Sequence, residues 1–117
     1  GNNDAHSKNF SLLYQSNPKV ARLAPLYDLI STVHYPDLSP KMAMKIESKY
    51  LPRQLRSEHW KQLWKEAGFT EAQARNRTIQ FTKKALSTVK KTDLTNPTQK
   101  SIADFIHMRA TAMLRLM

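Results

Sequence analysis

The chain has 117 residues, of which 40% are hydrophobic, and its 19 Lys and Arg against 9 Asp and Glu give a formal net charge of +10. This length is sufficient for one domain and too short for two ordinary ones. The absence of cysteine excludes a disulfide scaffold and a cysteine-based zinc site. No run of 18 apolar residues is present, so we expect a cytoplasmic protein with no membrane partner, and the excess positive charge favours a polyanionic partner.

The first part of the chain predicts a loop followed by a hairpin. Residues 1–9 are polar and lack periodicity, whereas Phe10–Tyr14 is a short apolar and aromatic run typical of a strand. A second extended run covers residues 20–30, where Pro25 argues against a continuous helix. Asn17-Pro18 supplies turn residues between the two runs, which predicts a hairpin with a turn of about four or five residues.

Pro36 and Pro40 interrupt the chain after the hairpin and predict a loop there. One more short strand is expected over Met42–Ile46. A helical period begins after Pro52.

The first predicted helix follows Ser57, which we expect to be its N-cap. Gly68 stands where a glycine is expected just after a helix. The residues predicted to share the apolar face are Trp60, Leu63, Trp64 and Ala67.

A long helix is predicted over Glu71–Lys91, because Thr70 and Gln73 form a capping box. Its basic residues Arg77, Lys84 and Lys91 recur every seven positions, opposite the apolar arc. That arc holds Ala74, Thr78, Ile79, Phe81, Ala85, Leu86 and Val89.

The last predicted helix begins after Asn96, with Pro97 at its first position and Gln99 completing a capping box. Arg109 lies within its wide apolar face and therefore has to extend to solvent, pair with an acid or contact a partner. The face consists of Ile102, Phe105, Ile106, Met113, Leu116 and Met117.

Asp4 and Asn9 have the spacing of a phosphoryl-transfer catalytic loop, D-x-x-x-x-N. In such a loop the Asp orients the attacking hydroxyl and the Asn holds Mg²⁺, while a further carboxylate, here Asp28, arrives after a hairpin. The alternative is a polar terminus or an Asx-turn without chemistry, and the spacing by itself leaves both open.

Four stretches together resemble the C-terminal lobe of HipA-type kinases, the toxins of bacterial toxin–antitoxin pairs. They are NNDAHSKNFSLL (2–13), LAPLYDLIST (23–32), KMAMKI (41–46) and HWKQLWKEAGF (59–69). The resemblance implies a mainly α fold, a helical kinase-like C-terminal lobe with a small β-hairpin near the N-terminus.

The same resemblance implies roles for individual residues. Asp4 would be the catalytic acid/base, and both Asn9 and Asp28 would hold metal. The residues implied to bind nucleotide are His6, Ser7, Lys8, Asn9, Tyr27 and Asp28. Two departures separate the chain from eukaryotic-type kinases, because Asn2-Asn3 replace His-Arg before the catalytic Asp and Leu29-Ile30 replace Phe-Gly after the metal Asp.

The chain has no Gly-rich motif, since its only glycines are Gly1 and Gly68. The resemblance implies that the phosphate-covering loop and its lysine lie before Gly1. We therefore expect residues 1–117 to be a single C-terminal domain of a longer kinase and inactive alone. Within it, 1–46 would carry the catalytic loops and hairpin, and 57–117 the helical part.

The intact parent is expected to be a serine/threonine-protein kinase that uses ATP and Mg²⁺. Its implied substrate is a protein of translation, such as an aminoacyl-tRNA synthetase, and its implied partners are a HipB-type antitoxin and, through that complex, operator DNA. Arg75, Arg77, Lys83 and Lys84 are candidates for DNA-backbone contacts, although a basic helix face is more commonly just solvated. The alternative function is a non-catalytic basic helical domain that binds nucleic acid or a protein.

The four histidines lack metal-ligand spacing and are expected to be structural or exposed, except for His6. Trp60 and Trp64 are expected in the core and not as a base-stacking platform.

Overall fold

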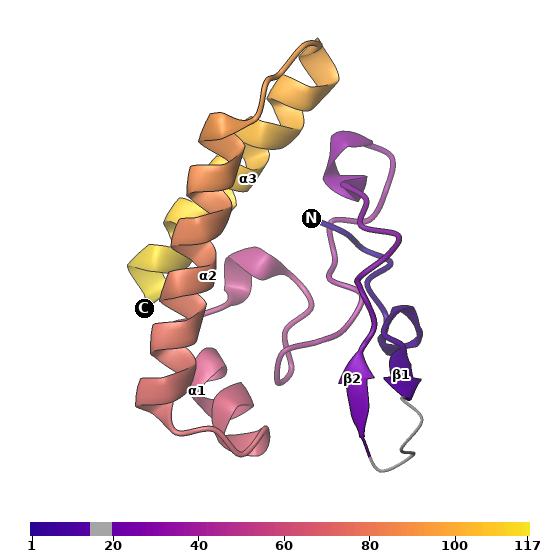
Figure 1. Cartoon of the computed structure of the whole chain (residues 1–117). Coiled ribbons are helices and arrows are strands. Elements are labelled where there is room, and N and C mark those ends of the chain that lie inside the picture. Colours follow the sequence, from indigo (N-terminus) through magenta and orange to yellow (C-terminus); the bar gives the residue numbers. More distant parts are fainter. Residues whose placement is uncertain (15–19) are drawn as a thin grey trace.

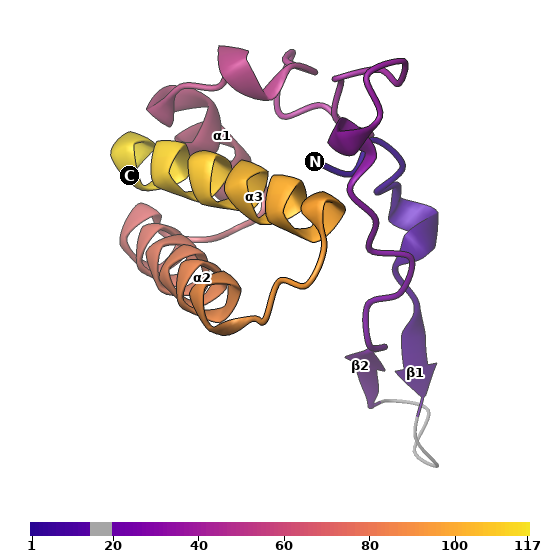
Figure 2. The ribbon, with the colours of Figure 1, turned by 90° about the horizontal axis from the view of Figure 1, so that it is seen from above.

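The computed structural model describes residues 1–14 and 20–117. Its larger part consists of three helices, α1 (Ser57–Glu66), α2 (Glu71–Lys91) and α3 (Pro97–Leu116). Helices α2 and α3 lie antiparallel and side by side, and α1 packs against α2 (Figures 1 and 2). This arrangement confirms the prediction of a mainly α fold.

The N-terminal part contains the predicted hairpin. Strand β1 (Leu12–Tyr14) pairs antiparallel with β2 (Ala21–Leu23), and Leu12 stands opposite Leu23. Figure 2 shows the two strands extending away from the helices. The predicted turn residues Asn17-Pro18 lie outside the described residues.

Three short 3₁₀ turns complete the described elements: η1 (Ser7–Asn9), η2 (Thr32–His34) and η3 (Pro52–Gln54). The turn η2 packs against α3 and so joins the N-terminal part to the helices. Figure 1 shows the N-terminus on the side of its segment that faces the helices.

The strand predicted over Met42–Ile46 is wrong. Ile46 and Lys49 form an isolated bridge by exchanging two main-chain hydrogen bonds of 3.0 Å, and the Met42 N–H donates to the Tyr50 carbonyl at 2.7 Å. The chain reverses at Glu47, which has a positive φ of 54°. Because the segment pairs with the residues that directly follow it, it does not join a longer ladder.

The predicted N-cap of α1 is also wrong by one residue. Arg56 is the cap, and Ser57 is the first helical residue. The Arg56 N–H donates to Nδ1 of His59 at 2.9 Å, and Nε2 of His59 lies 3.4 Å from the Glu47 carboxylate. The buried imidazole thus takes the place of the Glu or Gln that normally accepts from the N-cap N–H in a capping box, and His59 is a structural residue as predicted.

The end of α1 forms as predicted. Gly68 has a φ of 77°, and its N–H donates to the Lys65 carbonyl at 3.1 Å. The Phe69 N–H donates to the Trp64 carbonyl at 2.9 Å. These two bonds define a Schellman motif, which satisfies carbonyls that the helix itself leaves free.

Both longer helices begin at their predicted caps. The Thr70 hydroxyl accepts from the Gln73 N–H at 3.3 Å. At α3, the Asn96 side chain accepts from the Gln99 N–H at 2.9 Å, and the Gln99 side chain accepts from the Asn96 N–H at 3.3 Å. This reciprocal pair is a complete capping box.

The hydrophobic core is small and lies where the three helices meet. Its buried apolar residues are Leu55, Trp64, Ala74 and Ala103. Trp64 is buried in this core as predicted, whereas Trp60, whose ring is 6.5 Å from that of Trp64, is half-buried. By contrast, most of the exposed large hydrophobic side chains belong to residues 10–50.

In the part of the chain that the structure describes, no helix is both long enough and apolar enough to cross a bilayer.

Candidate functional site

The side chain of Asn2 connects the two segments that carry the candidate acids. Its Oδ1 accepts from the Asp4 N–H at 2.9 Å, and its Nδ2 donates to the Asp28 main-chain carbonyl at 3.2 Å. Asp4 precedes the hairpin in the sequence and Asp28 follows it, so one side-chain amide bonds the main chain on both sides of the hairpin.

The loop that follows Asp4 closes on the carbonyl of that residue. This oxygen accepts from the Asn9 side-chain Nδ2 at 2.9 Å and from the His6 N–H at 2.8 Å. The imidazole of His6 lies 3.5 Å from the Asp4 carboxylate. Because the nitrogen of the Asn9 amide is used here, its oxygen is the atom that remains as a potential ligand.

Tyr27 links the segment after β2 to the same loop. Its hydroxyl donates to the Lys8 carbonyl at 3.2 Å and lies 3.4 Å from the Ser11 hydroxyl. The next residue, Asp28, has a positive φ of 55°, a conformation that Asp tolerates better than most residues. Such backbone outliers are concentrated at functional sites.

Thr32 holds the first residues of the chain by hydrogen bonds. It is only 5% exposed, accepts from the Asn3 N–H at 2.9 Å and donates to the Gly1 carbonyl at 2.9 Å. Asn3 also donates from its side chain to the Ser39 carbonyl at 3.2 Å. The segment before Asp4 is thus held by long-range hydrogen bonds and is not a frayed terminus.

Arg109 of α3 is half-buried next to Gly1. Burial lowers the pKa of Arg109, and burial together with the nearby Arg109 guanidinium lowers the pKa of the Gly1 amino group. Among residues 1–14 and 20–117, no Asp or Glu forms a salt bridge with Arg109. We expected Arg109 to extend to solvent, to pair with an acid or to contact a partner, and the described residues show no pairing with an acid.

The predicted metal ligands offer hard oxygen donors. Within the described ranges, no cluster of three or more His, Asp or Glu side chains forms a metal cage. The oxygen of Asn9 and the carboxylate of Asp28 suit Mg²⁺, which normally keeps water and takes further oxygens from nucleotide phosphates. Their roles as ligands, like that of Asp4 as acid/base, stay predictions.

The structure thus gathers most of the predicted nucleotide-site residues around one loop. Ser7, Lys8 and Asn9 form η1, and Asp4 and His6 precede it. The Tyr27 hydroxyl is bonded to the Lys8 carbonyl, whereas Asp28 is bonded through its main-chain carbonyl to Asn2. Asn2 and Thr32 were missed as contributors. The sequence offers little signal for them, because their bonds join residues 26 to 31 positions apart.

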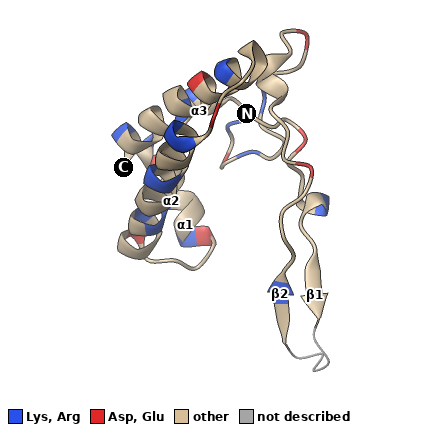
Figure 3. Ribbon diagram, turned by 45° about the horizontal axis from the view of Figure 1, so that its top comes forward, with Lys and Arg blue, Asp and Glu red and all other residues tan. Residues whose placement is uncertain are grey.

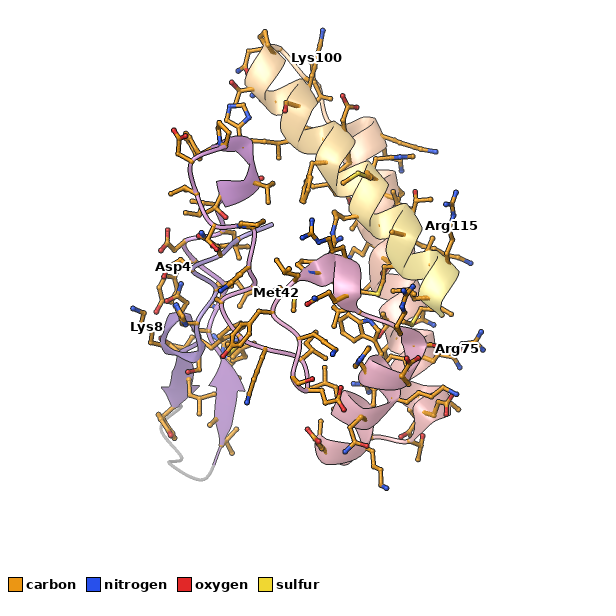
Figure 4. The ribbon with its side chains drawn as sticks, turned by 180° about the vertical axis from the view of Figure 1, so that it is seen from behind. Asp4, Lys8, Met42, Arg75, Lys100 and Arg115 are labelled. Carbon is orange, nitrogen blue, oxygen red and sulfur yellow. The ribbon has the colours of Figure 1, made fainter. Side chains whose placement is uncertain are left out.

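The candidate DNA-contacting residues lie elsewhere, on α2. Figure 4 separates Asp4 and Lys8 of the N-terminal part from Arg75 of the helices, and Figure 3 shows the concentration of Lys and Arg along α2. Arg75 donates to the Met117 main-chain carbonyl, and Arg77 borders a groove between the helices. Lys83 and Lys84 are exposed.

Comparison with known proteins identifies two relatives whose names describe them as putative kinases. The chain is 55% identical over 69 residues to "Putative kinase Y4mE" of Sinorhizobium fredii, covering 58% of this chain and 16% of that protein. It is 47% identical over 38 residues to a "Putative kinase" of Haemophilus influenzae, covering 32% of this chain and 11% of that protein. The matches therefore span only a small part of these relatives. No solved structure gives a significant match.

The family comparison covers both the site and most of the helical part. Residues 1–89 match the HipA-like C-terminal domain, a region that includes Asp4, Asn9, Asp28 and all of α1. The chain belongs to the HipA-like C-terminal domain family.

Proposed function

We propose that this chain provides the phosphoryl-transfer loop and the metal-binding carboxylate of a longer HipA-like serine/threonine-protein kinase. The observation that carries the proposal is the bridge made by Asn2, whose side chain is bonded to the main-chain N–H of Asp4 and to the main-chain carbonyl of Asp28. This connection shows an ordered loop and not a frayed polar terminus. Membership of the family and relatives named as kinases support the same reading.

Each residue of the loop has a distinct role in this proposal. Asp4 accepts the proton of the attacking serine or threonine hydroxyl, and the His6 imidazole 3.5 Å away helps to orient its carboxylate. The contact of Tyr27 with the Lys8 carbonyl holds the loop closed. Catalysis of this kind depends mainly on positioning, which explains why so many of the contacts are to the main chain.

ATP and Mg²⁺ are the proposed cofactors, with Asn9 and Asp28 as the residues that would hold the metal. When bound, the ion neutralises charge on the phosphates. The proposed substrate is a protein of translation, such as an aminoacyl-tRNA synthetase. The proposed partners are a HipB-type antitoxin and its operator DNA.

The test uses the longer protein and two substitutions with different expected effects. Asp4→Ala should lower transfer from γ-labelled ATP to proteins of a bacterial extract by about a hundredfold or more, while Mg-ATP binding measured by calorimetry is retained. Asp28→Ala should reduce both transfer and Mg-ATP binding. The control Asp37→Ala, at an exposed acid outside the site, should leave both unchanged.

A fully active Asp4→Ala protein would refute the assignment. The 117-residue chain alone should give little or no heat with Mg-ATP, and binding at micromolar concentration would contradict the proposed dependence on further parts of the protein. The rival function is a non-catalytic basic domain that binds nucleic acid or protein, which the net charge of +10 favours. It predicts that neither acid substitution changes partner binding.

A further inference from the structure

A pocket of about 290 Å³ lies where the loop before Asp4, the turn η3 and helix α3 meet. Figure 4 places Met42, one of its lining residues, between the N-terminal part and the helices. Apolar side chains form much of its wall, among them Val33, Leu51 and Phe105. A small cavity with an apolar wall and a few polar groups is typical of a site that holds one ligand group or one side chain of a partner.

Three positively charged residues border this pocket, and among the described residues that line it there is no Asp or Glu. They are Lys41, Arg53 of η3 and Arg109 of α3. None of the three forms a salt bridge with an acid in residues 1–14 and 20–117. Their charge does not depend on Gly1, whose nitrogen is uncharged when it forms a peptide bond. This balance of charge favours an anionic occupant.

The charged end of Arg109 lies at the pocket. Burial and then the Arg109 guanidinium lower the pKa of the Gly1 amino group, and Gly1 lines the same pocket. Arg109 is itself half-buried, and burial lowers its pKa because the cation loses hydration. A partly buried cation without a carboxylate partner is unfavourable, so an anion that pairs with it is bound more tightly.

The pocket also adjoins the candidate catalytic loop. Asn2 and Asn3 line it, and they directly precede Asp4 in the sequence. The Asn2 side chain accepts from the Asp4 N–H at 2.9 Å. The Asn3 side chain donates at 3.2 Å to the carbonyl of Ser39, which also lines the pocket. A ligand held here is therefore a neighbour of a hydroxyl group bound at Asp4.

We propose that this pocket binds a phosphorylated side chain of the protein substrate, beside the hydroxyl that receives the next phosphate. Arginine is suited to phosphate because its guanidinium donates two parallel hydrogen bonds, and Arg53 and Arg109 both border the pocket. A phosphate monoester carries about two negative charges at neutral pH and matches several cations better than one carboxylate does. The apolar wall is suited to the carbon atoms that carry the phosphate. The identity of the occupant as substrate rests on the proposed function, whereas phosphate binding does not.

Binding of a phosphopeptide to the longer protein tests the proposal. The probe is a fluorescent alanine-rich peptide that contains one phosphoserine beside a leucine, and its binding is followed by anisotropy. It should bind at least about tenfold more tightly than the same peptide with serine or aspartate in place of phosphoserine, because only the phosphate is a dianion. Inorganic phosphate should compete only weakly, because it lacks the apolar part.

Substitutions at the two arginines locate the bound phosphate. Arg53→Met and Arg109→Met should each weaken phosphopeptide binding by about tenfold, the loss expected for a charge-assisted hydrogen bond, while methionine keeps much of the apolar stem. Arg53 is exposed, so its substitution tests the pocket without disturbing the interior. Arg115→Met, at an exposed position near the end of α3, is the matched control and should bind as the unsubstituted protein does. Equal affinity for the phosphoserine and aspartate peptides, or unchanged binding in both arginine variants, would overturn the proposal.

Catalysis supplies a readout that separates this pocket from the proposed function. In the Asp4→Ala background phosphopeptide binding should persist while transfer is lost. With a phosphorylated substrate Arg53→Met should raise KM and leave kcat nearly unchanged, and prior treatment of the bacterial extract with a phosphatase should lower transfer to its proteins. If the phosphopeptide binds but the unsubstituted protein transfers no phosphate, only the proposed function fails. If transfer is normal and the phosphopeptide does not bind, only the pocket proposal is lost.

Discussion

Single side chains with two hydrogen bonds hold the candidate site together. Asn2 uses both ends of its amide, one on Asp4 and one on Asp28. Thr32 uses its hydroxyl both as acceptor, from Asn3, and as donor, to Gly1. Residues of this kind set the positions of functional groups without carrying out chemistry themselves, so their loss should be visible in stability.

Thr32→Val is expected to destabilise the chain by about 1–3 kcal/mol. The substitution keeps the shape of the buried Thr32 side chain, but it leaves the Asn3 N–H without its acceptor and the Gly1 carbonyl with only the Val33 N–H as donor. Urea unfolding followed by circular dichroism measures the effect. Thr88→Val, at an exposed position of α2, is the control and should stay within about 0.5 kcal/mol. Equal effects at both positions would argue against the role given to Thr32.

At the scale of elements, the helices begin and end where local chemistry predicts. Thr70 and Asn96 act within one turn of their own helices, so their capping is readable from neighbouring letters. The start of α1 differs because His59 takes the capping contact, and its orientation also depends on Glu47 from a separate loop. The Met42–Ile46 prediction failed for a related reason, since strand formation requires a partner strand and not only suitable residues.

Gly68 at the end of α1 allows a ranking of substitutions. A Cβ at this position would meet no atom within 4 Å, so the cost of a side chain comes only from the φ of 77°. Gly68→Ala should therefore lower the free energy of unfolding by about 1 kcal/mol, and Gly68→Asn by less, because Asn tolerates this conformation. Thermal and urea unfolding measure the order, and an alanine variant at least as stable as the parent would contradict it.

At the scale of the whole molecule, the small core and the net charge of +10 are the dominant features. The helices bury a few residues where they meet, while the hairpin keeps apolar side chains exposed on both strands. An isolated two-stranded hairpin is at best marginally stable, so its apolar residues are suited to contacts with further parts of a protein. That residues 1–117 form one domain stays a prediction.

The position of the basic residues on α2 predicts how their substitution changes the salt dependence of DNA binding. Nonspecific binding to duplex DNA can be measured by fluorescence anisotropy over a range of salt concentrations. The logarithm of the association constant should fall linearly with the logarithm of the salt concentration. Lys83→Ala and Lys84→Ala should each reduce the slope by about 1, as expected for one lost phosphate contact. Arg75→Ala should have a smaller effect, because its guanidinium already donates to the Met117 carbonyl. Lys45→Ala in the N-terminal part is the control, and equal effects at Lys45 and Lys84 would indicate that no particular face is used.

The sequence by itself determined the helix boundaries set by Thr70, Gly68 and Asn96, the hairpin, and the family. Each of these depends on residues close together in the chain or on stretches that can be compared directly. The loop spacing of Asp4 and Asn9 was likewise readable as a candidate site, although its catalytic role stays a prediction.

Only the tertiary structure decided which distant segments meet. The Asn2 contact with Asp28 and the Thr32 contact with Gly1 span 26 and 31 residues. The burial of Arg109 beside Gly1 brings together opposite ends of the chain. Such contacts depend on the path of the whole backbone, because a polar side chain can pair with any suitable group that the fold brings within reach.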